Sequence, residues 1–196
     1  MNAPTISLQE INQLPVIRFE GKILIIDTLP AFQKAINDIN TRGGTWGFDT
    51  ETRPSFKKGR TYNVSLIQLA NDDICYLFRL NRLGLRTELV DILTNPSILK
   101  IGLSLRDDLR GLNKMRSFQA QGFIDLQEYV QQFGIQEKSL KKICAIVLKA
   151  RISKNQQTSN WDAPVLNESQ QIYAATDAWV CLKIYQKLST TSPNHT

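Results

Sequence analysis

The stretch Trp46–Glu51 constrains the fold more than any other part of the sequence, because it combines a strand pattern with two closely spaced acids. Thr45, Trp46 and Phe48 are residues that favour a β-strand. Side chains two residues apart on a strand share a face. Asp49 and Glu51 are therefore predicted to project together, while Phe48 and Thr50 point to the opposite face.

Two carboxylates on one strand face are costly to bury unless a cation or protons compensate their charge. A divalent metal is the natural partner, because hard cations prefer carboxylate oxygens. A strand end where acids simply meet water explains an isolated Asp49-x-Glu51 pattern more cheaply. The segment 23–26 (Ile-Leu-Ile-Ile) is the expected pairing partner of this strand.

Length and composition predict one globular domain over residues 1–196, with 42% hydrophobic and 21% charged residues. Apolar runs stay shorter than the roughly 20 residues that a membrane helix needs. Residues 1–14 lack the basic and apolar pattern of a signal peptide. We therefore expect a cytoplasmic protein with no membrane contact and with short flexible tails at 1–14 and 189–196.

The histidine and cysteine content excludes several kinds of catalysis. His195 is the only histidine, so Ser-His-Asp and Cys-His mechanisms lack their base and histidine-ligated zinc sites lack their ligand. Cys75, Cys144 and Cys181 are odd in number and set in apolar surroundings, which predicts buried free thiols in a reducing compartment. The net charge of +6 suits a polyanionic partner without proving one.

Hydrophobic periodicity predicts an α/β protein with a mixed central sheet, an antiparallel meander followed by parallel strands, flanked by helices. Asn71-Asp72-Asp73 is predicted to be a tight turn in which both acids are only turn residues. Asp125, followed by Glu128, is interpreted as a helix cap rather than a metal ligand. Besides the acidic strand, we expect strands at 21–27, 64–70, 74–80 and 98–103, and helices at 30–40, 85–93, 106–113, 139–149 and 168–188.

Two further segments place acids at defined points of this fold. The strand at 98–103 runs into a helix that begins with Asp107 and Asp108, where acids ordinarily complement the helix dipole. Tyr173 and Asp177 lie four residues apart and so share one helical face. The alanines between and beside them allow close approach to a sheet, although a core tyrosine and a surface aspartate explain the pattern more simply when it is taken alone.

The loop 52–63 interleaves basic and aromatic residues beside the acidic strand. Lys57, Lys58 and Arg60 are candidates for contacting phosphates, with neighbouring aromatic rings stacking on bases. A solvated hairpin tip has the same composition, and the sequence favours neither interpretation.

Taken together, Asp49-Thr50-Glu51, Gly102 with Asp108 six residues later, and Tyr173-x-x-x-Asp177 resemble the three motifs of the DEDDy group of 3′-5′ exonucleases. This family includes ribonuclease D and the Werner helicase exonuclease domain. The resemblance extends over residues 21–188. It implies a ribonuclease H-like fold, two divalent metal ions (Mg²⁺ or Mn²⁺), and release of nucleoside 5′-monophosphates from the 3′ end of single-stranded or 3′-ended DNA or RNA.

Carried over position by position, the resemblance implies that Asp49, Glu51, Asp108 and Asp177 hold the metals. Tyr173 is implied to contact the attacking water in place of the histidine of the sister group. Helical periodicity favours Asp108 over Asp107 for the second motif. The alternative function is a nucleic-acid-binding module that keeps the fold but turns over little; no protein partner is predicted.

Overall fold

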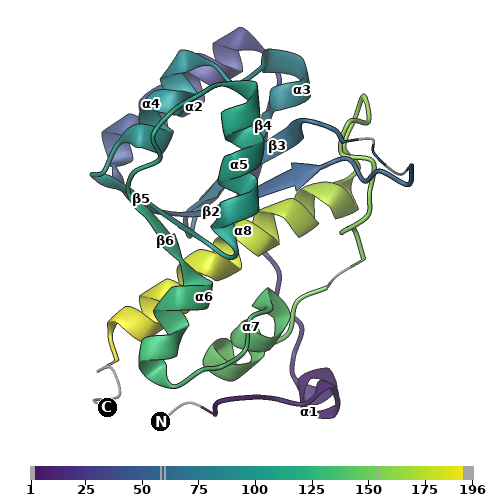
Figure 1. The fold of residues 1–196 in the computed structure, drawn as a ribbon, viewed down its shortest axis with the longest axis vertical. Coiled ribbons are helices and arrows are strands. Elements are labelled where there is room, and N and C mark those ends of the chain that lie inside the picture. The colour runs from purple at the N-terminus through teal and green to yellow at the C-terminus, as the bar shows by residue number, and fades with distance from the viewer. Residues whose placement is uncertain (1–2, 58, 60, 154, 192–196) are drawn as a thin grey trace.

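The computed structural model describes residues 3–57, 59, 61–153 and 155–191, and all statements below concern these residues. They form a mixed sheet in the order β1-β4-β3-β2-β5-β6, with helices on both faces (Figure 1). The strands are β1 (Lys22–Ile26), β2 (Gly44–Thr52), β3 (Val64–Ala70), β4 (Ile74–Arg79), β5 (Ile98–Gly102) and β6 (Phe123–Asp125). The predicted α/β class and ribonuclease H-like sheet are confirmed.

The strand pairing combines the expected meander with parallel neighbours. β2 pairs antiparallel with β3, and β3 pairs antiparallel with β4. On the other side of β2, β5 pairs with it in parallel, and β6 pairs in parallel with β5. The expected pairing of the segment 23–26 with the acidic strand is wrong, because β1 pairs in parallel with β4. Both edges of β2 are already occupied, by β3 through the meander and by β5.

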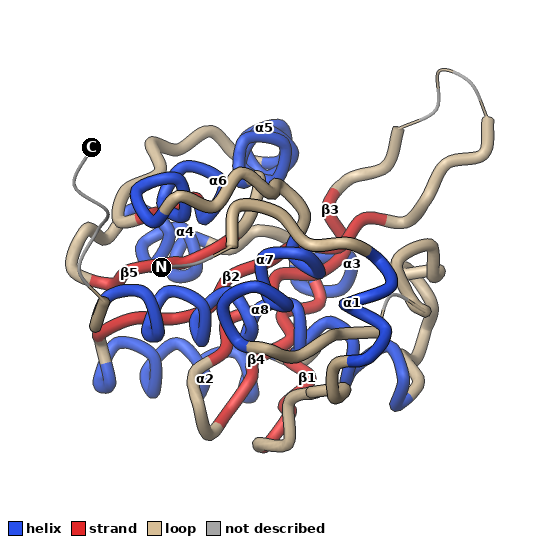
Figure 2. The backbone as a smooth tube through the Cα atoms, turned by 90° about the horizontal axis from the view of Figure 1, so that it is seen from below, coloured by secondary structure: helices blue, strands red, loops and turns tan. Residues whose placement is uncertain are grey.

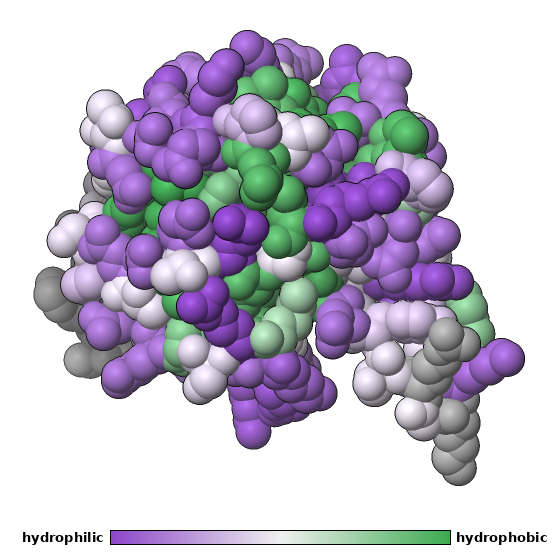
Figure 3. Space-filling view, turned by 90° about the horizontal axis from the view of Figure 1, so that it is seen from above, coloured by the Kyte–Doolittle hydropathy of each residue, from purple (hydrophilic) through white to green (hydrophobic). Residues whose placement is uncertain are grey.

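The main helices lie where the periodicity predicts them, and they separate into two layers. α2 and α4 pack on one face of the sheet, whereas α8 crosses the other face and is itself covered by α7. On the face seen from above, most of the outer surface is hydrophilic and hydrophobic side chains form a central patch (Figure 3). The helices are α1 (Leu8–Gln13), α2 (Leu29–Arg42), α3 (Leu80–Leu83), α4 (Thr87–Thr94), α5 (Leu105–Met115), α6 (Leu126–Tyr129), the 3-10 helix η1 (Val130–Phe133), α7 (Leu140–Leu148) and α8 (Glu168–Ser189).

The long helix α8 approaches the sheet unusually closely at one point on β2. A Cβ atom on Gly47 would lie 1.9 Å from the carbonyl oxygen of Ala178. Ala174, Ala175 and Ala178 are all fully buried at this contact. The predicted role of the small residues is thus confirmed, and it brings the backbone of α8 against the strand that carries the acids.

Residues 8–13, which were expected to belong to a flexible tail, form helix α1. Ser7 and Glu10 make a capping box at its start, and Ile11 is fully buried. The backbone N–H of Gln136 also donates to the carbonyl of Pro4. The short elements α3, β6 and η1 were not predicted, because three or four residues are too few to show a hydrophobic period.

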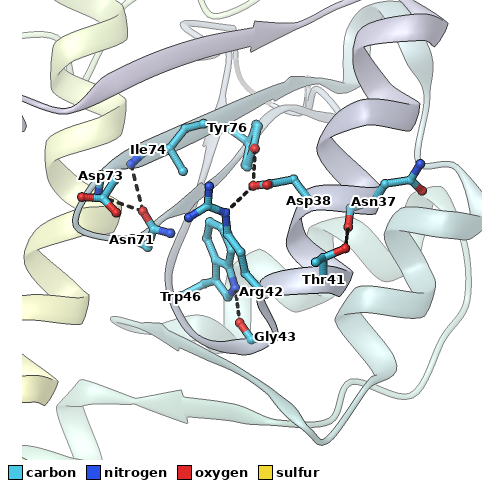
Figure 4. A network of polar contacts seen from close by, with 10 residues as sticks. All are labelled: Asn37, Asp38, Thr41, Arg42, Gly43, Trp46, Asn71, Asp73, Ile74 and Tyr76. Carbon is cyan, nitrogen blue, oxygen red and sulfur yellow. Dashed lines mark hydrogen bonds and ion pairs between the residues drawn. The ribbon is translucent and has the colours of Figure 1, made fainter.

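Polar contacts join strand β4 to helix α2 and stabilise the turn between β3 and β4 (Figure 4). The hydroxyl of Tyr76 on β4 donates to Asp38 on α2 at 2.6 Å, and Arg42 pairs with the same carboxylate. In the turn between β3 and β4, Asn71 accepts hydrogen bonds from the N–H groups of residues 73 and 74. Asp72 is more than a turn residue, because it accepts a hydrogen bond from Lys183 on α8 at 3.0 Å.

Candidate active site

Three acids from two distant parts of the chain meet where α8 crosses β2. Carboxylate oxygens of Asp49, Glu51 and Asp177 all lie within 4.8 Å of one another. Asp49 and Glu51 share the face of β2 that α8 covers, as their alternation predicts. The close contact at Gly47 and Ala178 places Asp177, one residue earlier on the helix, directly beside them.

The electrostatics of this cluster favour a bound cation. Burial, followed by the charges of Asp108 and Asp177, raises the pKa of Asp49 well above its ordinary value. Burial and the charge of Asp49 raise the pKa of Glu51 to about 10. Mutually repelling carboxylates with raised pKa values require protons or a cation. An oxygen-only set of donors fits a hard divalent ion such as Mg²⁺ or Mn²⁺.

Asp108 approaches the cluster from helix α5, along the edge of β2. β5 pairs with β2 only as far as Gly47, so the second half of β2 is open on that side. The hydroxyl of Thr50 donates a hydrogen bond to the Asp108 carboxylate there. Asp108 is not one of the three acids within 4.8 Å, although its charge raises the pKa of Asp49. Burial raises the pKa of Asp108 itself to about 6.

The two adjacent acids at the start of α5 have different surroundings. Asp107 forms an ion pair with Arg110 at 3.0 Å, and its side chain is 80% exposed. Asp108 lies against β2 and bonds to Thr50. The orientation expected from helical periodicity is therefore the one that the structure shows.

Asp125 anchors the turn from which α5 starts. Its carboxylate accepts hydrogen bonds from the N–H groups of Ser104, at 2.9 Å, and Leu105, at 2.8 Å. It also caps α6 by accepting from the N–H of Gln127, which confirms the predicted capping role. Ser104 has a left-handed φ of 59°. The contact with α5 was missed in the sequence, because residues 104 and 125 meet only when β6 pairs with β5.

Tyr173 lies one helical turn before Asp177 and is 9% exposed. Burial and the negative charges of Asp177 and Glu51 raise the pKa of its phenol, which also hydrogen-bonds Asp177. The fully buried ring of Trp161 packs against it, with the centroids 6.1 Å apart. This support could not be read from the sequence, because Trp161 and Tyr173 lie on different elements and meet only in the folded chain.

The described parts of the loop between β2 and β3 (residues 53–57, 59 and 61–63) extend beyond the sheet (Figure 2). The guanidinium of Arg53 lies over the ring of Tyr62, 5.0 Å from its centroid. Lys57 borders a hollow of 330 Å³ between this loop and the loop that contains Thr158. Lys58 and Arg60, the other two predicted phosphate contacts, lie outside the described residues.

All three cysteines are buried free thiols, as predicted. Among the helices that the structure describes, every one is too short or too polar to cross a bilayer.

The mixed sheet, with acids from β2 and α8 meeting on one face, defines a ribonuclease H-like nuclease fold with a carboxylate site. The family model described as 3′-5′ exonuclease matches residues 23–192. The chain therefore belongs to the 3′-5′ exonuclease family.

Individual relatives agree with this assignment. The chain is 31% identical over 186 residues to the bifunctional 3′-5′ exonuclease/ATP-dependent helicase WRN of Mus musculus, covering 90% of this chain and 13% of that protein. It is 32% identical over 143 residues to exonuclease 3′-5′ domain-containing protein 2 of Homo sapiens, covering 67% of this chain and 23% of that one. The chain thus spans less than a quarter of the length of either relative.

Solved structures show the same fold. The Trypanosoma brucei RNase D complex with RNA U12 superposes with a TM-score of 0.76 at 19% identity, covering 87% of this chain and 63% of the other. Escherichia coli RNase D gives a TM-score of 0.74 at 24% identity, with 86% and 44% covered.

Proposed function

We propose that the chain removes nucleotides one at a time from the 3′ end of single-stranded or 3′-ended DNA or RNA and releases nucleoside 5′-monophosphates. The observation that carries this proposal is the meeting of Asp49, Glu51 and Asp177 within 4.8 Å, with Tyr173 hydrogen-bonded to the last of them. Family membership supports the polarity of attack. Buried free thiols support a cytoplasmic location.

Two divalent ions, Mg²⁺ or Mn²⁺, are proposed to be held by Asp49, Glu51 and Asp177 together with Asp108. Bound there, such ions supply a water of lowered pKa and neutralise charge on the leaving 3′ oxygen. The pKa values of Asp49 and Glu51, raised by burial and then by neighbouring negative charges, support this set of ligands, because a cation compensates buried carboxylates. Asp108, which lies outside the three-acid cluster, is proposed as the fourth metal ligand and approaches from the open edge of β2.

Tyr173 is proposed to orient the attacking water rather than to remove its proton. Its phenol pKa is raised by burial and by the charges of Asp177 and Glu51, so the hydroxyl stays protonated near neutral pH. A protonated phenol that donates to Asp177 keeps an oxygen lone pair for the water. Packing against Trp161 restricts the ring to this position.

Lys57, Lys58 and Arg60 are proposed to contact the phosphates of the incoming strand. Lys57 borders the hollow between the two loops, and Arg53 stacked on Tyr62 adds a further cation there. Lysine and arginine contacts with phosphates release counterions, so binding is expected to weaken as salt increases.

The test uses DNA and RNA strands labelled at the 3′ or the 5′ end and incubated with Mg²⁺, Mn²⁺ or EDTA. We expect labelled mononucleotides from the 3′ end, a ladder from the 5′ label, and no product in EDTA. Asp108→Asn should lose at least about 100-fold in rate, whereas Asp107→Asn, the matched control, should remain active. Salt-sensitive binding without hydrolysis in any metal would instead establish a binding module.

A further inference from the structure

Gln68 is a buried amide in the centre of the sheet. It is 0% exposed, and neither its amide nitrogen nor its amide oxygen has a hydrogen-bond partner among the described residues. Its side chain offers two N–H donors and one carbonyl acceptor. Buried polar groups in folded proteins are almost always paired, so an unpaired amide at this depth requires an explanation.

The position of Gln68 points to the acidic cluster. It stands directly opposite Asp49 in the antiparallel pairing of β2 and β3. Residues directly opposite each other share a face and have Cβ atoms roughly 4.5–5.5 Å apart. Its opposite neighbour on β4 is Leu77, and the next residues on its own face, Leu66 and Ala70, are apolar. Asp49 is therefore the polar group on the neighbouring strand that its amide faces.

We propose that Gln68 is a positioning residue of the acidic site, whose side-chain N–H donates to the Asp49 carboxylate once the site holds its metal. This inference rests on the proposed function. A hydrogen bond to an ionised carboxylate is about twice as strong as one between neutral groups. Groups that orient a metal ligand in this way set its geometry, and their loss typically weakens metal binding about 10- to 100-fold.

A purely structural amide would lose a hydrogen bond on substitution, whereas the Gln68 amide has no hydrogen bond to lose in the metal-free fold. Gln68→Met keeps the length and volume of the side chain and removes only the polar atoms. Replacing an unpaired buried amide with an apolar group is neutral or stabilising. We therefore expect an unchanged or higher melting temperature in EDTA, together with a Mn²⁺ dissociation constant about 10- to 100-fold larger by calorimetry.

Leu77→Met is the matched control, because Leu77 lies on the same face and pairs with Gln68 on the side away from the acids. It should leave the Mn²⁺ dissociation constant unchanged. In the wild type, the Gln68 side-chain amide ¹⁵N–H resonances, assigned by their absence from Gln68→Met, should shift on saturation with Mg²⁺. Gln68→Leu serves as the second apolar variant if Gln68→Met does not fold.

An unchanged Mn²⁺ dissociation constant in either apolar variant, or amide resonances that do not respond to Mg²⁺, would overturn the positioning role. Lower stability in EDTA without weaker metal binding would overturn it as well, because it would show a purely structural amide. Failure of the proposed function is distinct, because the wild-type protein itself would then neither bind Mn²⁺ nor hydrolyse a strand.

Discussion

The hydroxyl of Thr50 holds the carboxylate of Asp108, although Thr50 belongs to the face of β2 opposite to its neighbours Asp49 and Glu51. This is possible because β5 leaves β2 after Gly47, so that α5 runs along an open strand edge. One short segment of strand therefore supplies two acids on one face and the support for a third from the other face.

Replacing Thr50 with valine should slow hydrolysis about 10- to 100-fold, because it removes this hydrogen bond at nearly constant volume. The rate under single-turnover conditions and the Mn²⁺ dissociation constant measure the effect. Thr45→Val on the same strand is the control and should change neither the rate nor the Mn²⁺ dissociation constant. Wild-type rates in Thr50→Val would show that Asp108 needs no support from β2.

Asp125→Ala should destabilise the protein by about 2 kcal/mol, because the N–H groups of Ser104 and Leu105 lose their acceptor. Urea unfolding checks the loss, and a weaker Mn²⁺ affinity is expected to accompany it as the start of α5 shifts. Asp125→Asn retains an acceptor oxygen and should recover part of the stability. Glu128→Ala, which removes the other acid of the same segment, should be nearly neutral.

Tyr173→Phe should lower kcat by up to about 100-fold and leave the Mn²⁺ dissociation constant nearly unchanged, because the ring stays packed and only the oriented hydroxyl is lost. Tyr185→Phe, farther along α8, provides the comparison and should keep full activity. Loss of metal binding in Tyr173→Phe would contradict the role in orienting water.

Gly47→Ala should destabilise the fold by about 3 kcal/mol, because the added Cβ would lie 1.9 Å from the backbone of Ala178 and would force α8 away from β2. Equilibrium unfolding in urea tests this value. Gly111→Ala is the control: its added Cβ would meet only a side-chain methyl of Val64, at 2.9 Å, which can move. Equal midpoints for the two variants would argue against the close contact.

Without metal, stability should fall as pH rises. The pKa values of Asp49, Glu51 and Asp108 in the folded protein lie above the value near 4 of an unfolded carboxyl, chiefly because the groups are buried. The folded state then binds more protons than the unfolded state, so the slope of stability against pH is negative from about pH 4 upward. We expect the melting temperature in EDTA to drop by at least roughly 5 °C between pH 5 and pH 8.

Asp49→Asn removes one ionising group from the cluster and should flatten this dependence, and saturating Mg²⁺ should raise the melting temperature of the wild type at pH 8. A melting temperature that rises with pH in EDTA would contradict the raised pKa values.

Local patterns were sufficient to predict the main strands and helices, because their apolar residues recur over five or more positions. Residues two apart on a strand or four apart on a helix share a face wherever the chain goes. The pairing of Asp49 with Glu51 and of Tyr173 with Asp177 was therefore predictable, as was the cap at Asp125. The likeness of the three acidic motifs to an exonuclease family then indicated which acids belong together.

Only the tertiary structure determined what depends on how the strands pair and where the helices pack. It placed β1 beside β4, turned Asp72 toward α8, joined Thr50 to Asp108 and set Gln68 opposite Asp49. These contacts link residues distant in sequence, and each depends on strand register and on the closeness of backbones at points such as Gly47. Periodicity along one segment carries no information about either, because the free energy that selects them comes from burying surfaces of separate segments against one another.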